Sequence, residues 1–326
     1  MQVRSKLDKG GQIFAAEGLP HTPYPFRRGA MISRLAPALC ASLVFLSSVA
    51  LAKSKAPTAP ASTSVAATPT EADWRTPDPR NVLVIDTTKG RIIFELSPEV
   101  APASAAQVRD LAHTGFYDGR GFFRVIEGFM DQTGDPTDTG TGGSSKPSLP
   151  AEFTFRRSAD TPLTVVVKAG GVEVGFIGAL PVISQTLDLG MLTADHKVHA
   201  YATFCAGVGG LARTANDPNS GNSQFYLMRG PTPHLDQNYT PFGRAIAGLD
   251  VIRAIKVGEP VEAPMDKMLK VRVLADIPAA ERPMVRVIDT RGAWFTAQVA
   301  KARADPAIDF SVCNLDIPSQ VSNPAK

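Results

Sequence analysis

The alternation of apolar and polar positions predicts a chain built mainly from short β-strands. Residues 81–96 (NVLVIDTTKGRIIFEL) hold two β-branched runs on either side of Thr88, Lys89 and Gly90, and a glycine can adopt the positive φ of a tight turn. This segment is therefore expected to form a β-hairpin. The same pattern predicts further short strands at residues 122–130, 201–213, 224–228, 242–246 and 270–274.

Two segments have a helical period instead. Residues 102–116 place Val108, Leu111 and Ala112 on one face, and residues 250–257 (DVIRAIKV) form a shorter amphipathic run that begins with a capping aspartate. Because short strands and turns rich in glycine and proline outnumber these helices, the pattern favours an all-β barrel or sandwich.

Two further stretches lie outside this plan. Residues 156–210 contain apolar runs of their own, LTVVVKAG and GFIGALPVI, and are too long for an ordinary loop, so part of this insertion is expected to be ordered. Residues 278–326 follow the last expected strand as a C-terminal extension, with a helix expected around residues 294–301.

The N-terminal part of the chain has the pattern of a secretory signal. Residues 35–52 (LAPALCASLVFLSSVALA) carry no charge, follow Arg34 and end in Ala-Leu-Ala. We therefore expect a signal peptide at residues 31–52, cleaved after residue 52, and an over-extended reading frame at residues 1–30. A retained membrane anchor and lipidation at Cys40 are the alternatives.

The residues after this signal are expected to form a linker and then an exported folded region. Residues 53–80 are rich in alanine, proline, serine and threonine, a composition typical of a disordered linker. The remaining cysteines are Cys205 and Cys313. In the periplasm or outside the cell they could pair, and the sequence leaves a disulfide and two buried thiols equally open.

The composition is that of an ordinary globular protein, with 326 residues, 44% hydrophobic and 20% charged positions, and a net charge of +3. This balance offers no basic surface for nucleic acid. The GTGG loop at residues 140–143 lacks the Gly-Lys-Ser/Thr of a phosphate-binding loop. His196 and His199 have no third ligand at a metal-site spacing, and no nucleophile motif is present. Nucleotide, metal and nucleophilic chemistries are therefore not supported.

Four motifs in a fixed order point to a different chemistry. They are FFRVIEGFMDQTGD (residues 122–135), GTGG, NSQFYL (residues 222–227) and LDQNYTPFGR (residues 235–244). Together they resemble the cyclophilins, a family of peptidyl-prolyl cis/trans isomerases, over about residues 81–277. The resemblance implies a closed antiparallel β-barrel capped by two helices, interrupted by the insertion and followed by the C-terminal extension.

The resemblance also gives a reason for Arg124 in its almost wholly apolar run. Rotation about a prolyl peptide bond faces a barrier of about 18–20 kcal/mol, because the amide nitrogen shares its lone pair with the carbonyl. A guanidinium is a permanent donor to that nitrogen as the lone pair localises, so the resemblance implies that Arg124 is catalytic and that no cofactor is needed. The substrate-binding residues implied in the same way are Phe129, Met130, Gln132, Gly140, Thr214, Ala215, Asn216, Gln224, Tyr226, Leu235 and Tyr239.

The family pattern further implies which part of the substrate each of these residues contacts. The proline ring would lie against Phe129, Met130, Tyr226 and Leu235. Gln132 would bind the substrate backbone and help to hold Arg124. Residues 215–216 would pair with the peptide main chain, while Gln224 and Gly140 would border the groove.

Some positions depart from the common family pattern. His234 stands where a tryptophan is usual, Tyr239 where a histidine is usual, and Tyr226 replaces a phenylalanine. These changes affect the expected sequence preference and inhibitor binding and leave the arginine chemistry intact.

The leading hypothesis is therefore an exported, monomeric prolyl isomerase acting on proline-containing segments of unfolded or folding proteins, with no nucleic acid or metal partner. The alternative is a proline-peptide-binding chaperone or scaffold with weak or no isomerase activity, which would not need Arg124. Residue by residue, Arg124 could instead be an ion-pair partner of Glu152 or Asp135, and the apolar pocket residues could be ordinary core.

Overall fold

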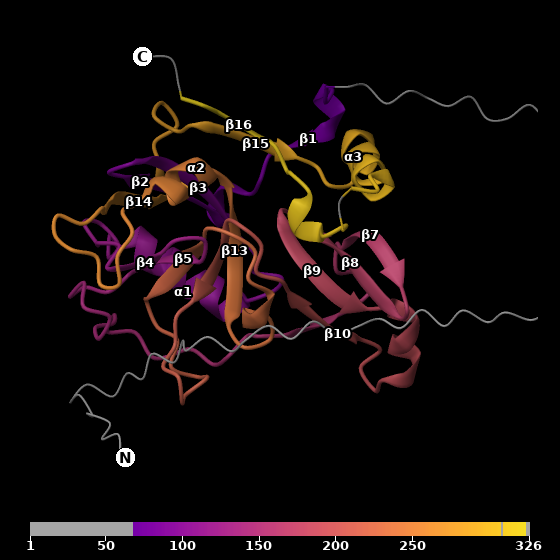
Figure 1. The fold of residues 1–326 in the computed structure, drawn as a ribbon, viewed down its shortest axis with the longest axis horizontal. Coiled ribbons are helices and arrows are strands. Elements are labelled where there is room, and N and C mark those ends of the chain that lie inside the picture. Colours follow the sequence, from indigo (N-terminus) through magenta and orange to yellow (C-terminus); the bar gives the residue numbers. More distant parts are fainter. Residues whose placement is uncertain (1–67, 308, 324–326) are drawn as a thin grey trace, which may run out of the picture. The chain divides into compact units, whose positions relative to one another are not determined.

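An eight-stranded antiparallel sheet carries most of the predicted motifs in the computed structural model, which describes residues 68–307 and 309–323 (Figure 1). In pairing order its strands are β14 (Met268–Val273), β2 (Val82–Thr87), β3 (Gly90–Leu96), β13 (Thr240–Ala247), β11 (Val208–Leu211), β12 (Phe225–Met228), β5 (Met130–Thr133) and β4 (Arg124–Ile126). The hairpin expected at residues 81–96 is confirmed, because β2 and β3 pair along their length on either side of a tight turn.

The main sheet curls, but its two end strands do not pair with each other in the described part of the chain. These end strands are β14 and β4. Isolated bridges join Val125 to Gly258 and Gly121 to Lys267, so loop residues connect the two edges where a strand ladder is absent. The structure thus shows a curled, mainly β sheet, and the full closure expected from the sequence stays a prediction.

The inner face of the main sheet packs against both predicted helices, α1 (Pro102–His113) and α2 (Leu249–Ala254). Their buried residues share one apolar cluster with strand residues such as Phe94, Phe225 and Phe242. This cluster fills the concave side of the sheet, which leaves the opposite, outer face for other contacts.

The second helix runs from Leu249 to Ala254 with Gly248 as its N-cap, whereas the sequence predicts residues 250–257 with Asp250 as the cap. It starts at Leu249, and the residue before it, Gly248, has a φ of 87°. A side chain at Gly248 would lie 2.6 Å from the carbonyl oxygen of Arg91, so this turn requires glycine. The glycine therefore sets the start of the helix, and Asp250 lies inside its first turn.

Residues 155–202, most of the expected insertion, form a second antiparallel sheet (Figure 1). Its strands in pairing order are β6 (Phe155–Arg157), β10 (Val198–Ala202), β9 (Leu180–Gln185), β8 (Val172–Ile177) and β7 (Thr164–Ala169). The sequence places the end of the insertion at residue 210, whereas Val208–Leu211 is a strand of the main sheet. The single strand expected at residues 201–213 is thus two strands, β10, which ends at Ala202, and β11. All four residues of β11 are buried, so no alternation marks its bounds.

The C-terminal extension contains a helix and two strands, and these strands form a third sheet together with a strand from before the main sheet. The sheet order is β1 (Trp74–Arg75), β15 (Met284–Ile288) and β16 (Ser319–Ser322), and α3 (Ala293–Ala304) confirms the helix expected around residues 294–301. Short 3-10 helices in the described residues are η1 (Glu71–Asp73), η2 (Pro79–Asn81), η3 (Leu187–Leu192), η4 (Pro233–Leu235), η5 (Leu274–Asp276) and η6 (Val312–Asn314).

The expected linker at residues 53–80 is therefore too long at its C-terminal end. Trp74 pairs with Ile288 of β15, and the guanidinium of Arg75 lies 2.6 Å from the carboxylate of Glu95 in β3. The residues from 71 onward carry acidic and aromatic side chains that the preceding Ala/Pro/Ser/Thr-rich residues of the expected linker lack.

The second sheet and the extension pack against the outer face of the main sheet. One buried apolar cluster contains Ile93 of the main sheet, Phe176 of β8 and Phe295 of α3, and the last two rings meet edge to face with centroids 5.5 Å apart. A disulfide joins Cys205 to Cys313 of the extension. Of the two alternatives that the sequence left open for these cysteines, the structure has the disulfide.

Several predictions for the N-terminal part lie outside the described residues. They are the over-extended reading frame at residues 1–30, the signal peptide at residues 31–52 and the part of the linker at residues 53–67. Within residues 68–307 and 309–323, no helix combines the length and the apolar character needed to cross a membrane.

Breaking the disulfide is expected to destabilise the folded chain, because Cys205 and Cys313 are 108 residues apart in sequence. Opening such a loop typically costs about 2–5 kcal/mol, which corresponds to roughly 5–20 °C in Tm for a domain of this size. Thermal unfolding of the double variant Cys205→Ser/Cys313→Ser measures this loss. A reductant should lower the Tm of the unmodified protein to a similar value and leave the double variant unchanged. An unchanged midpoint in the variant would contradict the expectation.

Candidate active site

The register of four strands places the predicted catalytic residue in a row with two predicted substrate-binding residues. Arg124 of β4 pairs with Gln132 of β5, Gln132 pairs with Tyr226 of β12, and Tyr226 pairs with Gly210 of β11. Directly paired residues of antiparallel strands point to the same face of a sheet. The three side chains therefore lie on the outer face, although Tyr226 is about a hundred residues from the other two in sequence.

Arg124 is a largely buried cation with a carboxylate partner. Its side chain is 15% exposed, and its Nε donates to Oε1 of Glu259 at 2.5 Å. Its Nη1 lies 3.5 Å from Oε1 of Gln132, the outer limit of a hydrogen bond. Desolvation of a guanidinium is costly, and the carboxylate offsets that cost from a half-exposed position.

The ion-pair partners suggested for Arg124 by the sequence, Glu152 and Asp135, are occupied elsewhere. Glu152 accepts hydrogen bonds from the backbone N–H groups of Ala103 and Ser104 in the first turn of α1. That position suits an anion, because the first backbone N–H groups of a helix have no partner within the helix. Glu259 was not foreseen, since nothing local in its sequence marks it.

Two glutamine side chains connect the arginine to the loop at residues 140–143. Nε2 of Gln132 donates to Oε1 of Gln224 at 3.0 Å. Nε2 of Gln224 donates in turn to the carbonyl oxygens of Gly140 at 3.0 Å and Gly142 at 2.8 Å. The structure thus brings Gln132, Gln224 and Gly140 together in one hydrogen-bonded chain that ends at Arg124.

The loop that receives this chain is shaped by one buried carboxylate. Asp135 is fully buried and accepts from the backbone N–H groups of Thr137 at 2.8 Å, Gly140 at 2.6 Å and Gly142 at 3.1 Å. Burial alone would raise the pKa of Asp135, but these donors outweigh it and hold the pKa below its usual value. A side chain at Gly142 would lie 2.2 Å from Oδ1 of Asp135, so the loop needs glycine there.

The predicted pocket residues belong to the apolar cluster on the outer face. Met130, Tyr226 and Leu235 are at most 7% exposed, and Phe129 is half-buried against them. At the rim, the exposed ring of His234 stacks on Phe129 with centroids 6.0 Å apart. These residues therefore lie together, next to the polar row.

Tyr226 fits its position closely because its pairing partner is glycine. A side chain at Gly210 would lie 2.3 Å from Cζ of Tyr226. The Tyr226 ring also meets Tyr239 edge to face with centroids 6.0 Å apart. Among the described residues its buried hydroxyl has no hydrogen-bond partner, and burial raises its pKa well above the usual value.

The exposed stretch at residues 214–216 is held by Arg213. The guanidinium of Arg213 lies 4.5 Å from the centre of the Tyr239 ring and donates through Nη1 to the carbonyl oxygens of Thr214 at 2.9 Å and Ala215 at 3.0 Å. This one side chain therefore joins the stretch predicted to bind the peptide backbone to the aromatic rim. Arg213 was not predicted from the sequence to have this role, because nothing in its local pattern marks it.

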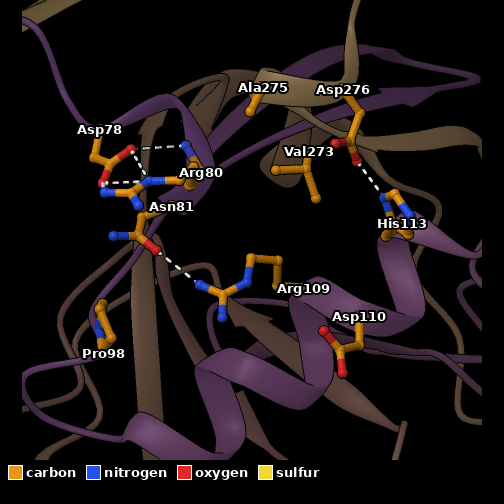
Figure 2. Close-up of a pocket in the computed structure, with 10 residues that line it drawn as sticks. All are labelled: Asp78, Arg80, Asn81, Pro98, Arg109, Asp110, His113, Val273, Ala275 and Asp276. Carbon is orange, nitrogen blue, oxygen red and sulfur yellow. Dashed lines mark hydrogen bonds and ion pairs between the residues drawn. The ribbon is translucent and has the colours of Figure 1, made fainter.

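A cavity of about 560 Å³ lies elsewhere and contains none of the predicted site residues (Figure 2). It is lined by η2, α1 and residues near η5, and its polar groups are largely paired: Arg109 donates to Asn81, and the His113 ring lies 2.7 Å from Asp276. Hydrogen bonding to Asp276 raises the pKa of His113. No group of three or more His, Cys, Asp or Glu side chains within the described ranges could hold a metal ion.

The comparisons with known proteins all indicate the same family. Residues 82–275 match the family model described as cyclophilin type peptidyl-prolyl cis-trans isomerase. A probable peptidyl-prolyl cis-trans isomerase of Brucella suis is 31% identical over 214 residues, covering 61% of this chain and 85% of the relative. Peptidyl-prolyl cis-trans isomerase-like 1 of Rhizopus delemar is 32% identical over 174 residues, covering 53% and 79% respectively.

A solved structure extends this similarity beyond the residues that match the family model. The cyclophilin AquaCyp293 from Hirschia baltica has a TM-score of 0.71 and 35% sequence identity, covering 78% of this chain and 95% of its own. Since residues 82–275 are a smaller share of the chain, part of the matching structure lies outside them.

Replacing Tyr226 by phenylalanine is expected to stabilise the protein. The change removes a buried hydroxyl without a partner in the described residues and keeps the ring that fills the space over Gly210. An unpaired buried polar group costs about 1–3 kcal/mol, so Tyr226→Phe should raise Tm by at least about 2–4 °C. Thermal unfolding measures this change, with Tyr239→Phe, at a half-exposed rim position, as the control expected to change Tm little. A lower Tm for Tyr226→Phe would show that the hydroxyl is satisfied in solution.

Proposed function

Because the chain belongs to the cyclophilin-type peptidyl-prolyl cis-trans isomerase family, we propose that Arg124 and the outer-face residues in register with it catalyse rotation of X-Pro peptide bonds. The observation that carries this proposal is the cross-strand row of Arg124, Gln132 and Tyr226 beside the apolar cluster of Met130 and Leu235. This arrangement places Arg124, a permanent hydrogen-bond donor, next to an apolar surface.

The reaction needs stabilisation of a twisted amide and makes no covalent intermediate. As the prolyl bond turns, the amide conjugation is lost and the lone pair localises on the prolyl nitrogen. Arg124 donates an N–H to that nitrogen, and its charge persists at any working pH. Its low exposure strengthens the interaction, because little water competes for the donor.

The remaining site residues bind and orient the peptide. The proline ring lies against Phe129, Met130, Tyr226 and Leu235. Gln132 bonds the substrate backbone, and residues 214–216 with Tyr239 form the rim along which the peptide main chain runs. Gln224 and Gly140 border the groove and hold Gln132 in place through their hydrogen bonds.

Replacing Arg124 by alanine should lower kcat/KM for an X-Pro peptide by roughly 10²–10³, the usual loss for one transition-state donor. The fold should survive, because the side chain lies on the outer face and the backbone pairing of β4 is unchanged. A protease-coupled or NMR exchange assay measures the rate, and circular dichroism checks the fold. Arg80→Ala, at a 76% exposed position away from the row, is the matched control. Near-normal activity in a well-folded Arg124→Ala would show that the assignment of Arg124 is wrong. Little or no activity in the unmodified protein would instead favour a proline-peptide-binding chaperone or scaffold.

We further propose that the protein is exported and acts, as a monomer, on proline-containing segments of proteins that fold outside the cytoplasm. The apolar segment at residues 35–52 supports export. The Cys205–Cys313 disulfide supports it independently, since disulfides persist in oxidising compartments and are rare in the cytosol.

Expression from Met31 in a bacterial host tests the export proposal. The mature protein should be recovered in the periplasmic fraction with Lys53 as its first residue, as read by mass spectrometry. A variant that lacks residues 31–52 should stay in the cytoplasm. Recovery of the uncleaved chain from the membrane fraction would support the anchor alternative, and uncleaved chain in the cytoplasm would refute export.

A further inference from the structure

The geometry points to Glu259 as a positioning residue for Arg124. This inference rests on the proposed catalytic role of the arginine. The two side chains are 135 residues apart in sequence, and Glu259 provides the carboxylate that contacts the Nε edge of the guanidinium at 2.5 Å. A different donor of the same guanidinium, Nη1, lies 3.5 Å from Oε1 of Gln132.

The backbone around Glu259 is fixed to β4 on both sides of the carboxylate. Gly258 exchanges two hydrogen bonds with Val125, at 2.8 and 2.9 Å, and the N–H of Val261 donates to the carbonyl oxygen of Phe123 at 2.9 Å. Phe123 and Val125 are the chain neighbours of Arg124. The loop therefore holds the carboxylate at a constant place relative to the arginine backbone, which a free surface side chain would not do.

Two contacts at different edges define the plane of the guanidinium. A guanidinium is flat, and its donors have a fixed angular arrangement. With Nε against Glu259 and Nη1 toward Gln132, the arginine keeps one orientation before the peptide arrives. Preorganised donors stabilise a transition state best, because no reorientation is needed during the reaction.

If Glu259 had a purely structural role, its replacement would lower stability together with turnover. Glu259 is 49% exposed, and ion pairs with an exposed partner contribute little to folding. The half-exposed carboxylate therefore offsets only a small part of the desolvation cost of Arg124, and its replacement should leave Tm nearly unchanged. A loss of turnover without a loss of stability indicates a positioning role. Measuring kcat and Tm on the same Glu259 variants separates the two roles directly.

The test compares five variants of the full folded chain on a short X-Pro peptide: Glu259→Gln, Glu259→Asp, Glu262→Gln, Arg124→Lys and the double variant Arg124→Lys/Glu259→Gln. Glu259→Gln should lower kcat about fivefold to tenfold, with KM and Tm almost unchanged. Glu259→Asp, which keeps the charge and shortens the reach, should recover part of the loss. Glu262→Gln removes one charge from an exposed position in the same loop and should behave like the unmodified protein.

The double variant Arg124→Lys/Glu259→Gln completes the comparison. A lysine has no Nε edge for Glu259 to orient, so the second change should cost less than twofold in an Arg124→Lys background. Full activity of Glu259→Gln, an equal loss in Glu262→Gln, or the same loss in the lysine background would each overturn the inference. None of these results would affect the role of Arg124, which the alanine variant tests separately.

Discussion

The register of β4, β5 and β12 is the constraint on which the candidate site depends. On the inner face, Asp131 of β5 and Arg229 after β12 are almost fully buried and 2.9 Å apart, and Arg229 also donates to the carbonyl of Ile255 after α2. A slip by one residue would reverse the faces, leaving this pair apart and turning Arg124 inward. Leaving one member of such a pair unmatched costs about 3–5 kcal/mol. The inner ion pair therefore holds the outer row in place.

The insertion and the extension take part in the same arrangement, because they share the outer face with the pocket. Phe204, which follows β10, lies with its ring centroid 6.0 Å from that of Tyr226. Its N–H donates to Asp236 and its carbonyl oxygen accepts from Thr232, so its backbone also fixes the turn that carries Leu235. The next residue, Cys205, is tied to the extension by the disulfide. The insertion and the C-terminal extension thus help to hold the predicted pocket residues in place.

The local sequence pattern was sufficient to predict the elements with strong periodicity and to single out the residues inside the four motifs. The β2–β3 hairpin and α1 follow directly from β-branched runs and from an apolar helical face. The short strand β1 was not predicted, because two residues are too few to show an alternating pattern. For β11 only the bounds were not predicted, because all four of its residues are buried and no alternation marks its ends. The roles of Glu259 and Arg213 were not predicted for another reason. Their roles arise from contacts with distant or backbone partners, and no spacing in a single sequence encodes such a contact.

The site places a polar row and an apolar surface side by side because a sheet face can carry both. Along each strand the outer positions are two residues apart, so Met130 and Gln132 of β5 point the same way and differ only in chemistry. In the proposed reaction the proline ring needs the apolar surface, and the twisted amide needs the polar row. A guanidinium in this setting must have its charge compensated without placing a carboxylate in the apolar pocket. Glu259 meets that requirement from the edge of the sheet, because its loop bridges β4 at the gap where the main sheet does not pair with itself.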